Sequence, residues 1–232
     1  TYAYVGTELD LFAQATNWKR YLQSVVPPFL TGDVLEVGAG IGTTTRAFSD
    51  GSASTWLCLE PDGDLAERAR GVRADPRTRI TAVRSHPVQD LEADRRFDCI
   101  LYVDVLEHIE HDRDELARAQ KHLRPGGHLV VIVPAHQWLF SEFDEAVGQF
   151  RRYSRASLRA VVPPGMDQVM LRYMDALGVA LSAANRVLLR ASSPTVGQIK
   201  TWDSAVVPLS RLVDPLLFWR AGKSVVGVWR QR

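Results

Sequence analysis

Hydrophobic and polar residues alternate in blocks along the first 135 residues. Nearly continuous apolar runs, typical of buried strands, lie at 33–37, 55–60, 79–83, 97–103 and 128–134. Runs with helical spacing separate most of them, at 43–50, 62–71 and 112–123, and a further helical run at 7–29 ends at Pro27-Pro28. Apolar strands that alternate with helices predict a parallel sheet covered on both faces, and right-handed crossovers make it doubly wound.

The pattern changes after residue 135. The segment 135–165 is rich in aromatic residues and arginine, and a strand-like run follows near 167–174. Two helix-like stretches come next, near 176–190 and 202–219, before "KSVVGVWRQR", which is typical of a last strand. We therefore predict an α/β fold: a Rossmann-like, doubly wound, mostly parallel seven-stranded sheet with helices on both faces and a helical insertion before the last strand.

Composition and charge narrow the function classes. The chain of 232 residues is 46% hydrophobic and 24% charged, with a net charge of +1, which is ordinary for a soluble globular protein. This charge supplies little attraction to nucleic acid, and no recognition module is visible, so no nucleic acid is expected. Cys58 and Cys99 lie inside apolar runs and are predicted to be core thiols of a reducing cytoplasm. No signal peptide and no run of membrane-spanning length is visible, so we expect a cytoplasmic protein.

The C-terminal part is basic and apolar. From residue 171 onward nine basic residues face three acidic ones. The stretch 202–219 carries tryptophan and phenylalanine at its ends and suits either a hydrophobic substrate wall or an interfacial helix. Pro208 and Pro215 are expected to break it into short pieces. This favours pieces that pack on the sheet and finish an acceptor pocket over peripheral contact with a membrane.

Three glycines at alternate positions follow the first predicted strand, in "VLEVGAGIGTTTRAF" at 34–48. Open α/β sheets bind ligands at the carboxyl ends of their strands, and this turn lies there. A tight turn alone also explains such glycines. Glu60 ends the next strand, where its carboxylate can accept hydrogen bonds from both hydroxyls of a ribose, although a solvated strand-end acid is the simpler interpretation. Together they indicate a nucleoside cofactor, and the third glycine falls at the wrong spacing for a dinucleotide.

A third motif makes the resemblance specific. "LEVGAGIGTTT", "LEPD", "FDCILYVDVLEHI" and "LRPGGHLVVIVP" follow in order between residues 31 and 135. In this, the chain resembles the class I S-adenosylmethionine (SAM) dependent methyltransferases that act on small molecules and lipids. The resemblance implies that Glu36 and the loop Gly38–Gly42 hold the methionine part of SAM, that Glu60 holds the ribose, and that 102–105 pass beside the cofactor.

Adenine recognition is less well defined. Methyltransferases of this kind often carry an acid in the loop after the third strand, but "RSHPVQDL" has none at 85–88. Adenine is therefore expected to meet backbone groups near His86–Val88, or Asp90. The residues predicted to bind the cofactor are Glu36, Gly38, Ala39, Gly40, Gly42, Thr43, Glu60, Pro61, His86, Val88, Tyr102, Val103 and Asp104.

Methyl transfer needs a base only when the acceptor must lose a proton. His108 follows the fourth strand and can take one near neutral pH, although a helix-start histidine bonded to backbone is an equally good interpretation. His108 and His111 match no metal-site spacing, so no metal is predicted. "PAHQWLFSEFDEAVGQFRRYS" at 134–154 resembles a family subgroup with Asp, Gly-His and Arg-Arg-Tyr in order, although Gln149 stands in place of the histidine. The predicted catalytic residues are His108, His136, Asp144, Arg152 and Tyr153.

Two interpretations of this last segment remain open. It forms either the acceptor site itself or an ion-paired loop that fixes a lid. We expect an N-terminal helical segment at 1–30, a SAM-binding α/β core at 31–135, and a lid, helical insertion and last strands at 136–232. The expected protein is a SAM-dependent methyltransferase with a small-molecule, lipid-like, peptide or natural-product acceptor, and O-methylation is favoured. The rival is an inactive protein of the same fold that binds the cofactor or a partner.

Overall fold

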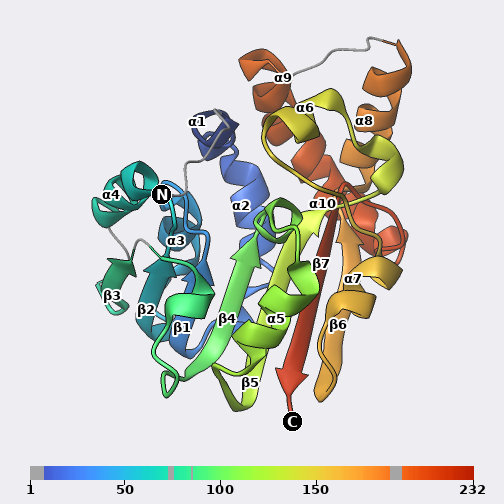
Figure 1. The fold of residues 1–232 in the computed structure, drawn as a ribbon. Helices are drawn as coiled ribbons and strands as arrows, with labels where there is room; N and C mark the ends of the chain where they lie inside the picture. The colour runs from blue at the N-terminus through green and yellow to red at the C-terminus, as the bar shows by residue number, and fades with distance from the viewer. Residues whose placement is uncertain (1–7, 73–75, 85, 189–194) are drawn as a thin grey trace.

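A seven-stranded sheet forms the centre of the molecule (Figure 1). The computed structural model describes residues 8–72, 76–84, 86–188 and 195–232. The sheet has the order β3-β2-β1-β4-β5-β7-β6. Strand β7 runs antiparallel to both β5 and β6, and all other neighbouring pairs are parallel. The strands are β1 Gly32–Val37, β2 Ala53–Leu59, β3 Arg79–Arg84, β4 Phe97–Val103, β5 Leu123–Pro134, β6 Met166–Met174 and β7 Ser224–Gln231. This confirms the predicted fold class.

The chain order reverses at β1, which pairs with β2 on one side and β4 on the other. Glu36 lies opposite Cys58 of β2 and Leu101 of β4, so the three strands end at the same edge. A ligand site is expected in the crevice outside the carboxyl ends of strands at such a switch point. The loops that follow β1, β2 and β4 therefore meet there.

Alternate strand residues supply two apolar cores, one on each face of the sheet. On β1, for example, Val34 belongs to one core and Leu35 to the other. The first core is covered by α2 Thr16–Gln23, α3 Thr43–Phe48 and α10 Val207–Leu216, and the second by α5 Asp112–Gln120, α7 Arg155–Val161 and η2 Val88–Asp90. The two cysteines are free and buried in these cores, as predicted.

The remaining helices lie around the ends of the sheet. Figure 1 shows α6, α8 and α9 beyond the carboxyl ends of the parallel strands. Their bounds are α1 Glu8–Ala13, α4 Gly63–Arg70, α6 Glu142–Ala146, α8 Ala176–Leu188 and α9 Val196–Thr201, with short turns η1 Pro27–Phe29, η3 Leu106–His108, η4 Gln137–Leu139 and η5 Trp202–Val206. Within the ranges given above, no helix combines the length and apolar character needed to cross a membrane.

One expectation about a helix and one about a strand are corrected. The run at 7–29 is not one helix, because the backbone leaves helical geometry at Ala15 and α2 starts anew. The carboxylate of Asp203 accepts the amide protons of Asn17 and Trp18 at 3.0 and 2.8 Å and so satisfies the start of α2. The strand predicted at 128–134 begins earlier, at Leu123, because Leu123 pairs with Phe97 before a bulge.

The expectation that prolines break 202–219 into short pieces is wrong. Helix α9, the π-helical turn η5 and α10 form one helical run from Val196 to Leu216. Pro208 stands at the start of α10, directly after the π-turn, where the change of hydrogen-bond register accommodates its missing N–H. Pro215 lies in the last turn, where a lost hydrogen bond does not interrupt the helix.

Candidate functional site

The loop after β1 turns sharply at its three glycines. Gly38, Gly40 and Gly42 have φ values of +70°, +54° and +76°, in the region that favours glycine. The amides of Gly38 and Ala39 donate to the carbonyl of Leu59 at 2.8 and 3.0 Å, which attaches this loop to the end of β2. Ala39 is buried, and Thr43 begins α3.

The three glycines serve different purposes. A Cβ on Gly38 would lie 2.4 Å from a methyl of Val105, and one on Gly42 would lie 2.5 Å from a methyl of Val72. These two positions exclude side chains because neighbouring elements pack directly against the loop. A Cβ on Gly40 would meet only a leucine methyl of α1, at an ordinary 3.7 Å. A Cβ at the middle glycine would therefore not clash, and the positive φ is what favours glycine there.

Glu60 closes the loop from the end of β2. Its carboxylate accepts the amide proton of Gly40 at 2.7 Å and that of Asp62 at 3.0 Å, with Pro61 between. Burial raises its pKa above the usual value. A carboxylate offers about four acceptor positions, of which the backbone uses two. The remaining positions can accept hydrogen bonds from the hydroxyls of a nucleoside, and this contact stays a prediction.

Glu36 is buried in the middle of the sheet. Its Oε2 accepts from the Thr45 hydroxyl at 2.5 Å and the Trp56 indole N–H at 2.8 Å. Burial raises its pKa to about 7, so the carboxyl is close to half ionised at neutral pH. Burial makes a negative charge on Glu36 energetically unfavourable. A cationic group nearby would offset this cost, which fits the predicted contact with the methionine part of SAM.

The remaining residues predicted to bind the cofactor lie on both sides of the sheet. Tyr102 is wholly buried and its hydroxyl donates to Glu115 of α5 at 2.9 Å, so only its backbone faces the strand edge. Val103 is half-buried. Val88 is wholly buried in the core under η2, while His86 is half-buried and its Nδ1 lies 3.0 Å from the Pro87 carbonyl. Their roles toward adenine stay predictions.

Asp144 and Arg152 form an ion pair inside the segment after β5. Oδ1 of Asp144 lies 2.7 Å from an Arg152 nitrogen, and Oδ2 accepts from the backbone and hydroxyl of Ser141 at the start of α6. His108 interacts with the backbone of Val147 and Gly148 in the same segment, and burial lowers its pKa. These contacts fit the interpretation of an ion-paired lid, and any contact with an acceptor stays a prediction.

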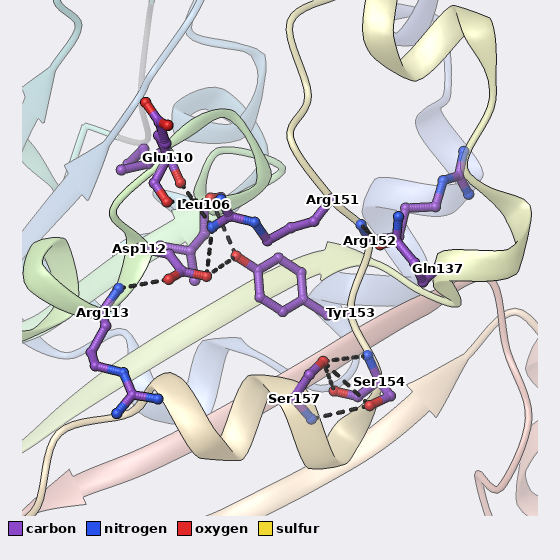
Figure 2. Close-up of polar contacts among 11 residues, drawn as sticks. Leu106, Glu110, Asp112, Arg113, Gln137, Arg151, Arg152, Tyr153, Ser154 and Ser157 are labelled. Atoms are coloured by element: carbon purple, nitrogen blue, oxygen red, sulfur yellow. Dashed lines mark hydrogen bonds and ion pairs between the residues drawn. The ribbon is translucent and has the colours of Figure 1, made fainter.

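The Tyr153 side chain points toward Asp112 (Figure 2). Its hydroxyl donates to Asp112, the first residue of α5, at 2.7 Å, and Arg151 holds the same carboxylate at 2.8 Å. Burial raises the pKa of the Tyr153 hydroxyl well above its usual range. The Tyr153 side chain thus joins the segment after β5 to α5, and its hydroxyl already has a hydrogen-bond partner in Asp112.

His136 lies where the lid begins and has a φ of +68°. Its Nε2 lies 3.0 Å from the carbonyl of Gly222, and its ring stacks on Tyr173 with 4.9 Å between centroids. Burial lowers its pKa, so the ring is neutral at pH 7. It is half-buried beside the exposed Trp138.

Asp104 shows a feature that the sequence interpretation did not assign to it. It has a φ of +52°, and its side chain is exposed, yet surrounding protein raises its pKa to about 6 by desolvation. The positive charges of Lys223, Lys19 and Arg152 act in the opposite direction. An accessible but poorly solvated carboxylate is a common sign of a functional site.

Glu107 lies one turn further along the same loop. It is wholly buried, and neither carboxyl oxygen meets a hydrogen-bond partner among the residues that the structure describes. Burial and the nearby charge of Asp104 raise its pKa well above the usual value. Burial thus favours the protonated form of Glu107, while Asp104, with a pKa of about 6, is mainly ionised at neutral pH.

The positive charges of two lysines, Lys223 and Lys19, act on Asp104, and the sequence analysis did not identify either residue. The Lys223 ammonium lies 4.5 Å from the centroid of the Trp202 ring, and burial lowers its pKa. Lys19 donates to the carbonyls of Phe12 and Ala13, each at 3.1 Å. No sequence signal marks them, because they lie more than 200 residues apart and only the sheet order brings them to Asp104. Over the described ranges, no three His, Cys, Asp or Glu side chains are placed to hold a metal ion.

Comparison with known proteins identifies the family of the chain. The model of the methyltransferase domain family matches residues 12–174. The chain is 32% identical to a demethylmenaquinone methyltransferase of Tropheryma whipplei (strain Twist) over 136 residues, which cover 58% of this chain and 55% of that protein. It is 29% identical to a trans-aconitate 2-methyltransferase of Deinococcus radiodurans over 206 residues, 83% of this chain and 77% of that protein. The match to the first relative thus spans about half of that protein's length.

Solved structures share the fold. N-methyltransferase NodS from Bradyrhizobium japonicum WM9, in complex with S-adenosylhomocysteine, aligns with a TM-score of 0.59 at 13% identity, over 97% of this chain and 90% of that one. The chain belongs to the methyltransferase domain family, among the class I SAM-dependent methyltransferases. Its cofactor is accordingly S-adenosylmethionine.

Proposed function

We propose that the protein transfers a methyl group from SAM to an oxygen atom of a small-molecule acceptor, with Asp104 as the general base. The observation that carries the proposal is the accessible Asp104 carboxylate, whose pKa is raised to about 6 at the carboxyl edge of the sheet. A base is most effective when its pKa lies near the working pH. Asp104 follows β4, directly beside the loop predicted to hold the cofactor.

The chain's own residues would position and deprotonate the acceptor. SAM, when bound, supplies a methyl group activated by its positive sulfonium. A hydroxyl acceptor must lose its proton as it attacks, and ionised Asp104 can accept that proton. Burial and the charge of Asp104 raise the pKa of the neighbouring Glu107, which disfavours a second negative charge beside the base. Lys223, Lys19 and Arg152 stabilise negative charge that develops on the acceptor oxygen.

The same charges suggest the acceptor class. Three cationic side chains near one carboxylate favour an acceptor that is rich in oxygen or carries a negative group. The relatives named above carry the names of enzymes that act on demethylmenaquinone and trans-aconitate. These names support a small-molecule acceptor, which includes lipid-like molecules and natural products.

The test combines cofactor binding with turnover. We expect one molecule of S-adenosylhomocysteine to bind per chain in calorimetry, and an acceptor screen by mass shift to identify a methylated hydroxyl. Asp104→Asn should keep this binding but lose about 100-fold or more in kcat/KM. In the wild type, log kcat/KM should rise with pH below about 6 and level off above it, because the ionised form is active. Asp167→Asn, an exposed aspartate of β6, is the matched control.

Three results would contradict the proposal. Full turnover in Asp104→Asn would exclude Asp104 as the base. Loss of cofactor binding in that variant would assign Asp104 to the cofactor instead. Cofactor binding without any methylated product would favour an inactive binding protein of this fold.

A further inference from the structure

Helix α10 buries polar side chains and exposes leucines, the reverse of an ordinary surface helix. Its buried positions include Ser210 and Asp214, which are wholly inaccessible. Asp214 accepts from the backbone amides of Asp175 and Ala176 at 2.7 and 2.8 Å and from the Tyr21 hydroxyl at 2.8 Å. Ser210 donates to Asp175 at 2.6 Å. The polar side of α10 therefore faces the protein and is satisfied there.

Large apolar side chains occupy the opposite side. Leu209, Leu212 and Leu216 follow one another at spacings of three and four residues and are 53%, 69% and 77% exposed. Leu217 and Phe218 extend the surface beyond the helix, and Phe218 is 74% exposed. We call Leu209, Leu212, Leu216, Leu217 and Phe218 the leucine face. A helix on a protein surface normally directs such residues inward, so this face indicates contact with something apolar.

The turn that ends α10 keeps Phe218 outside. Phe218 and Trp219 both have a φ of +51°, which bulky residues rarely adopt. The Trp219 amide donates to the Asp214 carbonyl at 2.9 Å, and the Arg172 guanidinium lies 4.6 Å from the Trp219 ring centroid. Trp219 is thus held against the protein, whereas its neighbour Phe218 is left in solvent beside Arg220.

The exposed charges on α10 and on the turn that follows it have one sign. In the stretch 204–220, which the structure describes throughout, Arg211 and Arg220 are exposed and the single acid, Asp214, is buried. A two-fold contact between copies through this face would bring these arginines together without an acid to pair them. A surface of anionic lipids offers both apolar chains and negative headgroups.

We propose that the leucine face docks onto a bilayer that contains anionic lipids, with the leucines and Phe218 among the acyl chains and Arg211 and Arg220 at the headgroups. The helix lies on the membrane, which fits its length of ten residues. Asp175 joins this helix to the candidate site, because it also accepts from the indole of Trp202, whose ring lies under Lys223. The inference does not depend on the identity of the acceptor.

The test is flotation with vesicles of stated composition. The full chain should bind vesicles of equimolar phosphatidylcholine and phosphatidylglycerol, bind phosphatidylcholine alone much less, and dissociate as salt is raised. The double variant Leu212→Glu/Leu216→Glu should lower the partition coefficient by about tenfold or more for each leucine. Arg211→Glu/Arg220→Glu should lower it by roughly fivefold or more for each arginine. Val169→Glu, a similarly exposed apolar position on β6, should leave it unchanged.

Each variant is first checked for thermal unfolding and for binding of S-adenosylhomocysteine, so that a folding defect is recognised. Absence of wild-type binding at low salt would overturn the proposal, as would unchanged vesicle binding in the leucine double variant. A concentration-dependent dimer that this variant abolishes, without vesicle binding by the wild type, would assign the face to a second copy instead.

Discussion

The α/β half of the molecule, residues 32–134, and the C-terminal helical layer around α8 and α10 place their polar residues in opposite ways. In the first, the strands bury apolar side chains such as Trp56, Ile100 and Val131, and most groups predicted to bind the cofactor lie in the loops at the sheet edge. In the second, Asp175 and Asp214 are wholly buried while leucines face outward. Hydrophobic burial therefore organises the first region, whereas a network of buried hydrogen bonds to Asp175 and Asp214 organises the second.

The largest effect is expected where this network is broken. Asp214→Ala leaves the amides of Asp175 and Ala176 and the Tyr21 hydroxyl without their acceptor. Loss of so many buried hydrogen bonds to a charged group should lower the free energy of unfolding by about 3–5 kcal/mol. Urea denaturation measures this value. Asp167→Ala, which removes an exposed aspartate paired with Arg232, should lower the free energy of unfolding far less, because water and salt screen a surface ion pair. Equal costs for the two variants would refute the contrast between the regions.

Glu36 is one of several buried acids in the first region, and its effect on stability depends on pH. Its pKa is about 7 in the folded protein and near 4.5 in the unfolded chain, so the folded state binds the proton more tightly. The contribution of Glu36 to the free energy of unfolding is therefore most favourable below pH 4.5. It falls as pH rises to 7, by on the order of 2–3 kcal/mol in total. Glu36→Gln cannot ionise and should remove this decline.

The measurement is thermal or urea unfolding of wild type and Glu36→Gln at a series of pH values without cofactor. The variant should be the more stable protein at pH 8, and the difference should shrink toward pH 4.5. Added S-adenosylhomocysteine should then stabilise the wild type more than the variant if Glu36 holds the methionine part. A difference that is constant with pH would show that Glu36 does not titrate as its burial requires.

The sequence predicted the first region closely because one rule, apolar residues inward, governs it. The strand at 97–103 was predicted with its exact bounds, and β1, β2 and β3 within two residues. The glycine loop and Glu60 could be proposed as cofactor contacts because both follow strand ends at the switch point of the sheet, and these contacts stay predictions. The close packing of Val105 against Gly38 and of Val72 against Gly42 could not be predicted, because it depends on how distant elements pack.

The second region could not be predicted from the same rule. Leucines at positions 209, 212 and 216 indicate a core-facing stripe in any pattern analysis, but the structure turns them outward. The reason is that Asp214 caps the start of α8 and Asp203 caps the start of α2, contacts that join residues 38 and more than 180 positions apart. Likewise Asp104, Lys19 and Lys223 gain their shared environment only from the sheet order.

The smallest effect should come from the leucine face itself, and this makes it the sharpest test of the contrast. Leu216→Gln removes a side chain that is 77% exposed, so little apolar burial is lost on folding. Leucine and glutamine have similar helix propensities. The free energy of unfolding should change by about 0.5 kcal/mol or less in water. Urea denaturation measures it, with Leu129→Ala in the wholly buried centre of β5 as the contrasting variant, expected to cost about 2–5 kcal/mol. A loss above about 2 kcal/mol in Leu216→Gln would mean that this leucine is buried in solution, and the helical layer would then follow the same rule as the sheet.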